Sequence, residues 1–296
     1  MRQSREQIEK ERIDFINRCT EHDRDRLLTE SFPDSAIVKE DGASYAGDDL
    51  AEHRYDLYIP AEGPRLCDEA FILIHGGAFV YGTSLLDKRY GMYLAARSGL
   101  MVFNLNYRLL PDTGICGSIE DICRGVSFIS EKYNIRKIHV TGDSAGGYLA
   151  LATVLCHRPG RFAEELKIAV NKDVTAVSAG LICGVYLLDK ESFPGALFEK
   201  EEELPDHMYD LCAAAARSDM PPMVLITGEG DYLREDSLRL KKICDEAGIR
   251  AELLDYKAVP GRDMHHVFPV SDPTWPESCD AIEAISACAL SESAGA

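Results

Sequence analysis

The residues with the clearest chemical potential surround one serine. Ser144 stands in HVTGDSAGGYLALA, residues 139–152, where a β-branched run changes to a helical pattern within a few positions. The small residues Gly142 and Gly146 allow a sharp turn, which lifts the serine hydroxyl above the strand and directs the amino terminus of the helix toward whatever binds there. This pattern predicts a nucleophile. A glycine-rich turn that happens to carry a serine is the alternative that the motif alone leaves open.

A serine hydroxyl needs a base within hydrogen-bond reach, and the base needs a carboxylate to orient it. Asp231 follows the apolar run at 221–228, and a later apolar run precedes a loop with His265 and His266. The ends of parallel strands meet at one edge of a sheet, so these groups are expected beside Ser144. A turn or helix cap is the alternative for Asp231, although Asp236 could fill that role instead.

An acyl-transfer reaction also needs N–H groups that stabilise the developing oxyanion. The segment FILIHGGAF, residues 71–79, places small residues just after an apolar run, where the backbone can approach a substrate closely. His75 in this segment is expected to anchor the loop rather than to carry a proton, because the base is already supplied elsewhere. The expected donors are the amides of Gly76, Gly77, Ala78 and Ala145.

Short apolar runs alternate with longer amphipathic segments over most of the chain. In the helix expected over 118–132, apolar residues recur at helical spacing behind a capping pattern of Ser118 and Asp121. Such alternation predicts an α/β fold with a mostly parallel sheet and helices on both faces. The expected buried strands are 70–76, 100–107, 137–142, 176–184, 221–228 and 251–259.

Two further segments precede this alternation. Residues 5–28 form an imperfect apolar stripe among many charges, which predicts a helical arm that lies against another part of the chain. In HRYDLYIP, residues 53–60, alternation places Tyr55, Leu57 and Ile59 on one face, as expected for a half-buried strand.

The length favours one catalytic domain over residues 1–296, with a small cap. The segment 186–205 lacks a regular pattern and interrupts the alternation, so we expect cap elements at approximately 1–50 and 186–219, above the carboxyl edge of the sheet. The aromatic residues expected to line the acyl pocket, each of them equally suited to the core, are Phe79, Tyr81, Tyr148, Tyr186 and Phe198.

Composition excludes several classes of partner. The formal net charge is −18 and no basic cluster offsets it, which argues against nucleic acid and anionic membranes as partners. No apolar run approaches the ~18 residues that span a bilayer, and the amino terminus lacks an apolar signal core, so a cytoplasmic location is expected. The ten cysteines contain no Cys-x-x-Cys pair, which favours buried structural thiols over a zinc site.

Taken as a set, five motifs resemble those of the hormone-sensitive-lipase-like branch of the α/β-hydrolase superfamily, which includes many carboxylesterases and acetyl esterases. They cover about 55 to 270 and stand in the family's order: HGGAF at 75–79, NYRLLPD at 106–112, GDSAGG at 142–147, PPMVLITGEGDYL at 221–233 and HVF at 266–268. The resemblance implies Ser144 as nucleophile, Asp231 as orienting acid and His266, rather than His265, as base. Ala78 replaces the usual third glycine of the loop, and the insertion after residue 184 is short for the family.

The expected function is hydrolysis of small carboxylic esters, from acetyl to butyryl, through an acyl-enzyme on Ser144 with no metal or other cofactor. An arylformamidase or a small-peptide hydrolase would use the same residues. A non-catalytic small-ligand receptor on the same fold is the alternative from another class. The amino-terminal arm and an apolar helix at 278–290 could also support a homodimer.

Overall fold

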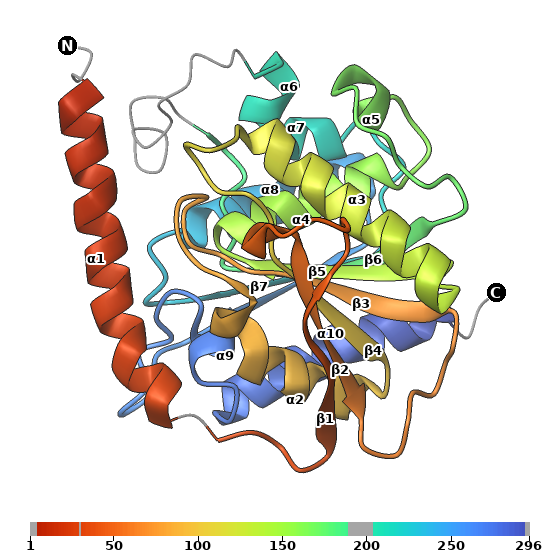
Figure 1. The fold of residues 1–296 in the computed structure, drawn as a ribbon. Helices are drawn as coiled ribbons and strands as arrows, with labels where there is room; N and C mark the ends of the chain where they lie inside the picture. The colour runs from red at the N-terminus through yellow and green to blue at the C-terminus, as the bar shows by residue number, and fades with distance from the viewer. Residues whose placement is uncertain (1–4, 30, 189–203, 294–296) are drawn as a thin grey trace.

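The computed structural model describes residues 5–29, 31–188 and 204–293 (Figure 1). Eight strands form one sheet in the order β1-β2-β4-β3-β5-β6-β7-β8. The strands are β1 (Ala36–Ser44), β2 (Arg54–Pro60), β3 (Glu69–Ile74), β4 (Met101–Leu105), β5 (Lys137–Asp143), β6 (Thr175–Ile182), β7 (Met223–Gly228) and β8 (Ala251–Tyr256). Only the pairs β1/β2 and β2/β4 are antiparallel, which confirms the predicted α/β class with a mostly parallel sheet.

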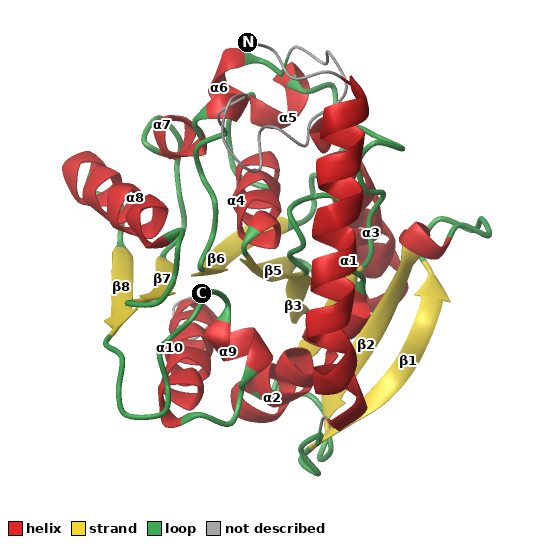
Figure 2. Cartoon of the chain, turned by 90° about the vertical axis from the view of Figure 1, so that its left-hand side faces the viewer, coloured by secondary structure: helices red, strands yellow, loops and turns green. Residues whose placement is uncertain are grey.

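Helices cover both faces of this sheet (Figure 2). The longer ones are α1 (Arg5–Thr29), α2 (Lys88–Ser98), α3 (Ile115–Tyr133), α4 (Ala145–Cys156), α8 (Arg234–Ala247) and α10 (Pro276–Ser293). The shorter helical elements are η1 (Ala51–His53), η2 (Ser84–Asp87), α5 (Phe162–Glu165), α6 (Asp206–Tyr209), α7 (Leu211–Ala215) and α9 (Phe268–Ser271). Helices α2 and α10 pack together on one face, and α3, α4 and α8 cover the other.

The central strand β3 shows why two cores form. Its Ile72 and Ile74 side chains belong to the core beneath α3 and α4, whereas Phe71 and Leu73 belong to the core beneath α2 and α10. Successive side chains of a strand point to opposite faces, so an uninterrupted apolar run is stable only where helices cover both sides. All six predicted strands of this kind are present, but the edge strand β8 is only partly buried.

Two predictions about the first strands are wrong. Residues 54–60 form β2, which is buried on both faces rather than half-buried, because helix α2 packs against it on one side and Phe128 of α3 contacts its Tyr55 on the other. Residues 36–44 were expected in the cap, but they form the edge strand β1, whose register on β2 is interrupted by irregularities between Val38 and Ala43. A mixed apolar and charged segment such as AIVKEDGAS lacks the strict alternation that identifies a strand by itself.

Helix α3 also starts differently from the prediction. It begins at Ile115 behind Gly114, so Ser118 and Asp121 lie inside the helix and cap nothing. The Ser118 hydroxyl donates to the carbonyl oxygen of Arg108, and the Arg108 guanidinium donates to Asp121 through two bonds of 2.7 and 2.8 Å. These polar residues therefore fasten the loop after β4 to α3, a use that local sequence does not distinguish from capping.

The described helices include none that is both long enough and apolar enough to cross a membrane. All ten cysteines lie within the described ranges and form no disulfide there, and five of them are buried. Those five are Cys123, Cys156, Cys183, Cys212 and Cys244.

Candidate active site

The turn from β5 into α4 has the sharp geometry that the sequence predicts. Ser144 adopts φ 52° and ψ −119°, an unusual conformation for a residue with a side chain, and α4 begins at the next residue. A Cβ atom on Gly146 would lie 2.1 Å from the Ile74 carbonyl oxygen, and one on Gly142 would lie 2.4 Å from the Gly146 oxygen. Both positions therefore need glycine, because the turn packs directly on the end of β3.

The His266 imidazole joins the serine to the carboxylate. Its Nε2 lies 3.0 Å from Ser144 Oγ, and its Nδ1 lies 2.7 Å from Asp231 Oδ1. Ser144 follows β5, Asp231 lies in the loop after β7, and His266 lies in the loop after β8. The structure thus brings together three residues far apart in the chain, at the carboxyl ends of parallel strands.

Asp231 is held in its charged form. Burial by itself would raise the pKa of this carboxyl, but the hydrogen bond and the electrostatic interaction with His266 outweigh burial and lower the pKa below its ordinary value. The Leu233 amide and the Thr227 hydroxyl donate two further bonds to it, at 2.9 and 2.7 Å. An ionised acceptor on Nδ1 holds the imidazole in the orientation that leaves Nε2 free to accept a proton from Ser144.

The neighbouring acidic and basic candidates have other partners. The His265 ring lies 3.1 Å from Asp263 and packs edge-on against Trp275, so the histidine that reaches Ser144 is His266. Asp236, the alternative to Asp231, accepts the Tyr186 amide at 2.8 Å.

The loop after β3 supplies amides beside Ser144, but fewer than expected. The Gly76 amide donates to Asp143 Oδ1 at 3.0 Å, so the prediction of Gly76 as an oxyanion donor is wrong. The amides of Gly77, Ala78 and Ala145 donate no hydrogen bond to any described residue and line the same cavity as Ser144. Ala78 adopts φ 52°, a left-handed conformation that explains why glycine would also suit this position.

His75 holds this loop in place. Its ring stacks on Tyr107 with centroids 4.4 Å apart, and Nδ1 lies 2.8 Å from the Gly76 carbonyl oxygen. The Tyr107 hydroxyl donates to the His75 carbonyl at 2.7 Å. Burial lowers the pKa of His75 to about 4, so the ring is neutral at pH 7 and acts as part of the scaffold.

The catalytic candidates open into a cavity of about 610 Å³. One wall comes from α1, which contributes Phe15, Arg18, Cys19, His22, Asp23 and Arg26. Helix α1 is attached there by the Tyr81 hydroxyl, which donates to Asp23 at 3.0 Å, and by Arg26, which donates to the Leu86 carbonyl oxygen at 3.3 Å. The lining also includes Val185, Tyr232, Val267 and Val270.

Most of the aromatic residues expected in this pocket lie elsewhere. Tyr81 lines the cavity, whereas Phe79, Tyr148 and Tyr186 are completely buried in the core and are absent from its lining. Phe79 and Tyr148 pack edge to face with centroids 5.6 Å apart. Sequence alone does not specify whether each ring points to the cavity or to the core, and for these three residues the core alternative is the correct one. Phe198 lies outside the described residues.

Comparison with known proteins identifies the family of this chain. Residues 71–269 match the family described as the alpha/beta hydrolase fold. The chain belongs to that family. The superfamily inferred from the five motifs is thereby confirmed for this α/β hydrolase.

Several relatives of this α/β hydrolase are esterases. An isoprenylcysteine alpha-carbonyl methylesterase of Arabidopsis thaliana is 26% identical over 241 residues, which are 73% of this chain and 55% of the relative. An acetyl esterase of Salmonella dublin is 27% identical over 203 residues, 64% of this chain and 62% of the relative. The chain thus spans just over half of the length of these curated relatives.

Solved structures cover the chain more completely. Esterase B from Lactobacillus rhamnosis has a TM-score of 0.84 and 25% identity, over 98% of this chain and 99% of that one. An esterase from the bacterial hormone-sensitive lipase family has a TM-score of 0.71 at 20% identity, over 97% of this chain and 98% of that one, which shows the shared fold.

Among the cavity residues that sequence reasoning missed are Asp87, Asp143 and Tyr232. The Tyr232 ring lies against His266 with centroids 4.2 Å apart, and Asp87 and Asp143 lie buried in the cavity lining. Asp143 and Tyr232 are sequence neighbours of Ser144 and Asp231, and this adjacency was a usable signal. Asp87 stands in an unremarkable segment, and only the fold brings it to the site.

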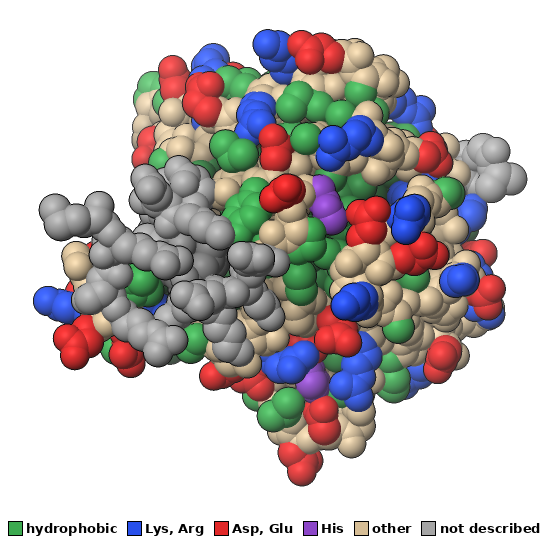
Figure 3. All heavy atoms as spheres, turned by 90° about the horizontal axis from the view of Figure 1, so that it is seen from above, with side chains coloured by type: hydrophobic (Ala, Val, Ile, Leu, Met, Phe, Trp, Pro, Cys, Tyr) green, Lys and Arg blue, Asp and Glu red, His purple; other side chains and the backbone are tan. Residues whose placement is uncertain are grey.

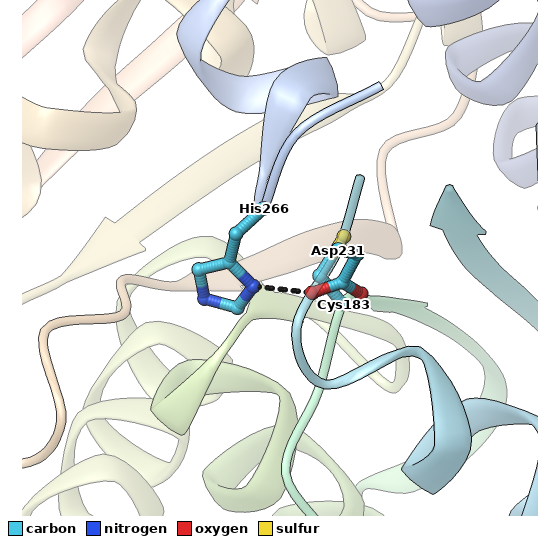
Figure 4. Close-up of side chains that lie close together, drawn as sticks. All are labelled: Cys183, Asp231 and His266. Atoms are coloured by element: carbon cyan, nitrogen blue, oxygen red, sulfur yellow. Dashed lines mark hydrogen bonds and ion pairs between the residues drawn. The ribbon is translucent and has the colours of Figure 1, made fainter. Parts of the chain in front are cut away.

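A buried thiol accompanies the histidine and the carboxylate. Cys183, Asp231 and His266 offer atoms within 4.8 Å of one another, a spacing that an ion could bridge (Figure 4). However, burial and the charge of Asp231 raise the pKa of Cys183 well above its ordinary value, so the sulfur stays protonated. The Asp231 and His266 atoms are engaged with each other, and the group therefore fits a hydrogen-bonded relay better than a metal centre.

Proposed function

We propose that this chain is a carboxylic ester hydrolase that works through an acyl-enzyme on Ser144. One observation carries the proposal: His266 lies within hydrogen-bond distance of both Ser144 Oγ and Asp231, beside amides that donate no bond to described residues. The relatives named as esterases support the same reaction class.

In the first step His266 Nε2 accepts the Ser144 proton while Oγ attacks the ester carbonyl carbon. The negative charge that develops on the carbonyl oxygen is stabilised by the amides of Gly77, Ala78 and Ala145, of which Ala145 also lies at the amino end of α4. His266 then protonates the departing alcohol. In the second step water, deprotonated by His266, attacks the acyl-enzyme, and the acid leaves with Ser144 restored.

The substrates that we propose have short acyl chains, from acetyl to butyryl. A cavity of about 610 Å³ lies within the usual range for small-molecule sites, and its walls are mainly apolar. The relative named acetyl esterase and a solved esterase B inhibited by a tributyrin phosphonate support short chains.

Replacing the nucleophile tests the mechanism. Ser144→Ala should lower kcat on p-nitrophenyl butyrate by about a million-fold, because the acyl-enzyme cannot form. Ser127→Ala, a change of the same kind on α3 outside the cavity lining, should leave kcat unchanged. A fluorophosphonate probe should label Ser144 in a peptide identified by mass spectrometry. Substantial residual hydrolysis by Ser144→Ala would refute the mechanism, and an ester that binds without turnover or labelling would favour a receptor.

A substrate panel tests the acyl preference. With p-nitrophenyl esters of two to sixteen carbons, kcat/KM should be highest between two and four carbons and should fall for longer chains. A steady rise toward sixteen carbons would contradict the proposed substrate class. Aryl formamides and small peptide amides belong in the same panel, and a higher kcat/KM on either would replace the ester as substrate.

A further inference from the structure

An aromatic ring lies beside the imidazole of the candidate active site. The Tyr232 ring contacts the His266 ring, with centroids 4.2 Å apart and planes inclined by 37°. Tyr232 also lines the cavity that contains Ser144, and it is 65% exposed. Of the exposed large apolar side chains in the described part of the chain, Tyr232 alone lines this cavity. Most of this residue is therefore accessible to a bound molecule.

The turn that carries Tyr232 is held by the same carboxylate that orients His266. The Asp231 amide donates to the Gly228 carbonyl oxygen at 3.0 Å, and the Leu233 amide donates to Asp231 Oδ1 at 2.9 Å. Asp231 Oδ1 also lies 2.7 Å from His266 Nδ1. One buried side chain thus fixes both the imidazole and the backbone on either side of Tyr232, so the two rings are positioned together.

The chemistry of ester cleavage determines which part of a substrate reaches this ring. In the proposed mechanism His266 gives a proton to the departing alcohol, so the alcohol oxygen must lie within hydrogen-bond reach of Nε2. The carbonyl oxygen lies instead at the amides of Gly77, Ala78 and Ala145. Because Tyr232 packs on the imidazole, the group attached to the alcohol oxygen is the part of the substrate placed next to its ring.

We propose that Tyr232 forms an alcohol subsite that selects a planar aromatic group, so that the preferred substrates are short-chain esters of neutral aromatic alcohols. The assignment to the alcohol side rests on the proposed function. A planar ring can pack on Tyr232 in an offset or edge-to-face arrangement, which is worth about twofold to tenfold in affinity beyond the area buried. Tyr232 touches the substrate without taking part in bond breaking, so it is a specificity-determining residue.

The surroundings of Tyr232 suit such a group. The cavity lining also offers the apolar side chains of Phe15, Val185 and Leu233. The net charge of −18 favours a neutral alcohol over an anionic one.

Two matched esters test the selection. Benzyl butyrate and cyclohexylmethyl butyrate share the acyl chain and have primary alcohols of similar size, but only the first carries a planar aromatic ring. For the wild type, kcat/KM should be about twofold to tenfold higher on benzyl butyrate. Tyr232→Leu should bring the ratio of the two values close to one, mainly through a higher KM for the benzyl ester, because stacking stabilises the bound substrate and the transition state alike. Tyr232→Phe is the matched control, since it keeps the ring and should keep the ratio.

Two kinetic results would overturn the subsite. One is a ratio that is the same in the wild type and in Tyr232→Leu, with circular dichroism showing the variant folded. The other is an equal fall of kcat on both esters in Tyr232→Leu, because the ring would then act only by positioning His266.

Binding of the product alcohols tests the subsite without catalysis. In a nuclear magnetic resonance titration of the wild type, benzyl alcohol should shift the ring proton resonances of His266 and should bind about twofold to tenfold more tightly than cyclohexylmethanol. Cyclohexylmethanol is the more apolar of the two, so burial of apolar surface alone predicts the opposite order. Tyr232→Leu should remove the preference for benzyl alcohol. Equal or weaker binding of benzyl alcohol to the wild type would contradict the proposal.

The outcomes distinguish this proposal from the ester hydrolase mechanism. If Ser144→Ala retained substantial hydrolysis while the wild type bound benzyl alcohol more tightly, the aromatic subsite would stand and the acyl-enzyme on Ser144 would not. If Ser144→Ala lost its activity while the wild type bound the two alcohols equally, the mechanism would stand and the subsite would not.

Discussion

Gly76 shows how one hydrogen bond changes the assignment of a site. Gly76, Gly77 and Ala78 follow His75, and sequence alone does not distinguish their three N–H groups as donors to an oxyanion. In the structure the Gly76 amide is bound to Asp143, which leaves Gly77 and Ala78 facing the cavity together with Ala145. A motif therefore identifies the loop, whereas the individual roles depend on where each N–H points.

The anchoring role of His75 predicts a pH dependence of stability. Burial lowers the pKa of His75 from an ordinary value near 6.5 to about 4, so between these values the unfolded chain binds a proton that the folded protein does not. Stability should therefore be retained above pH 6.5 and fall as the pH drops toward 4, by a total of about 3 kcal/mol from this group.

His75→Gln isolates this contribution, because glutamine does not titrate. Urea unfolding at several pH values should give a shallower loss of unfolding free energy for the variant than for the wild type between pH 6.5 and 4. Parallel curves for the two proteins would contradict the assignment of His75 as a buried neutral ring.

At the scale of elements, the site depends on how closely the start of α4 approaches the end of β3. The first residues of α4 pack against the carbonyl groups of Ile74 and His75, and β3 pairs with β5 in parallel along its length. Ser144 and the loop after β3 thus leave adjacent strands, and a small separation of these elements would misplace one group relative to the other.

Gly146→Ala tests this approach. Its Cβ would lie 2.1 Å from one backbone oxygen and 2.5 Å from another, so α4 must move away from β3. We expect a loss of stability of about 1 to 3 kcal/mol, as for other overpacked sites, and a lower kcat. Gly125→Ala on α3 is the control, since its closest contact is a flexible Leu105 methyl group at 3.2 Å. Equal effects of the two changes on kcat would argue against the close approach as the cause.

At the scale of the whole molecule, the net negative charge affects which partners and substrates can approach. The net charge is −18, and the face seen from above mixes acidic and basic side chains without a continuous basic patch (Figure 3). Such a field repels anions over distances of about 10 Å at 0.1 M salt. The absence of a nucleic-acid partner therefore stays a prediction, as do location and oligomeric state.

Salt should consequently affect charged and neutral substrates differently. For a butyrate ester of a phenol sulfonate, kcat/KM should rise several-fold between about 0.02 and 0.5 M sodium chloride, because screening weakens the repulsion. The butyrate ester of a neutral phenol serves as the control and should change little. If kcat/KM for the anionic ester fell with salt, attraction by Arg18 on the cavity wall would be stronger than repulsion by the net negative charge.

The fold was predictable because each buried strand is a continuous apolar run and because apolar residues recur at helical spacing in the intervening helices. The errors arose where contacts between segments distant in the chain determine the local structure or the partner of a side chain. Strand β1 is recruited by pairing with β2, Ser118 and Asp121 bind the loop at Arg108, and the rings of Phe79, Tyr148 and Tyr186 turn into the core.

Local sequence by itself indicated the turn at Ser144, because Gly142 and Gly146 stand where a strand pattern changes to a helical one, and it indicated the order of the buried strands. The motif resemblance already favoured His266 over His265, and the structure agrees. Only the tertiary structure decided that Gly76 is bound to Asp143 and that Asp87 lines the site. These are contacts between segments distant in the chain, and their geometry follows from the packing of the whole sheet rather than from any neighbouring residue.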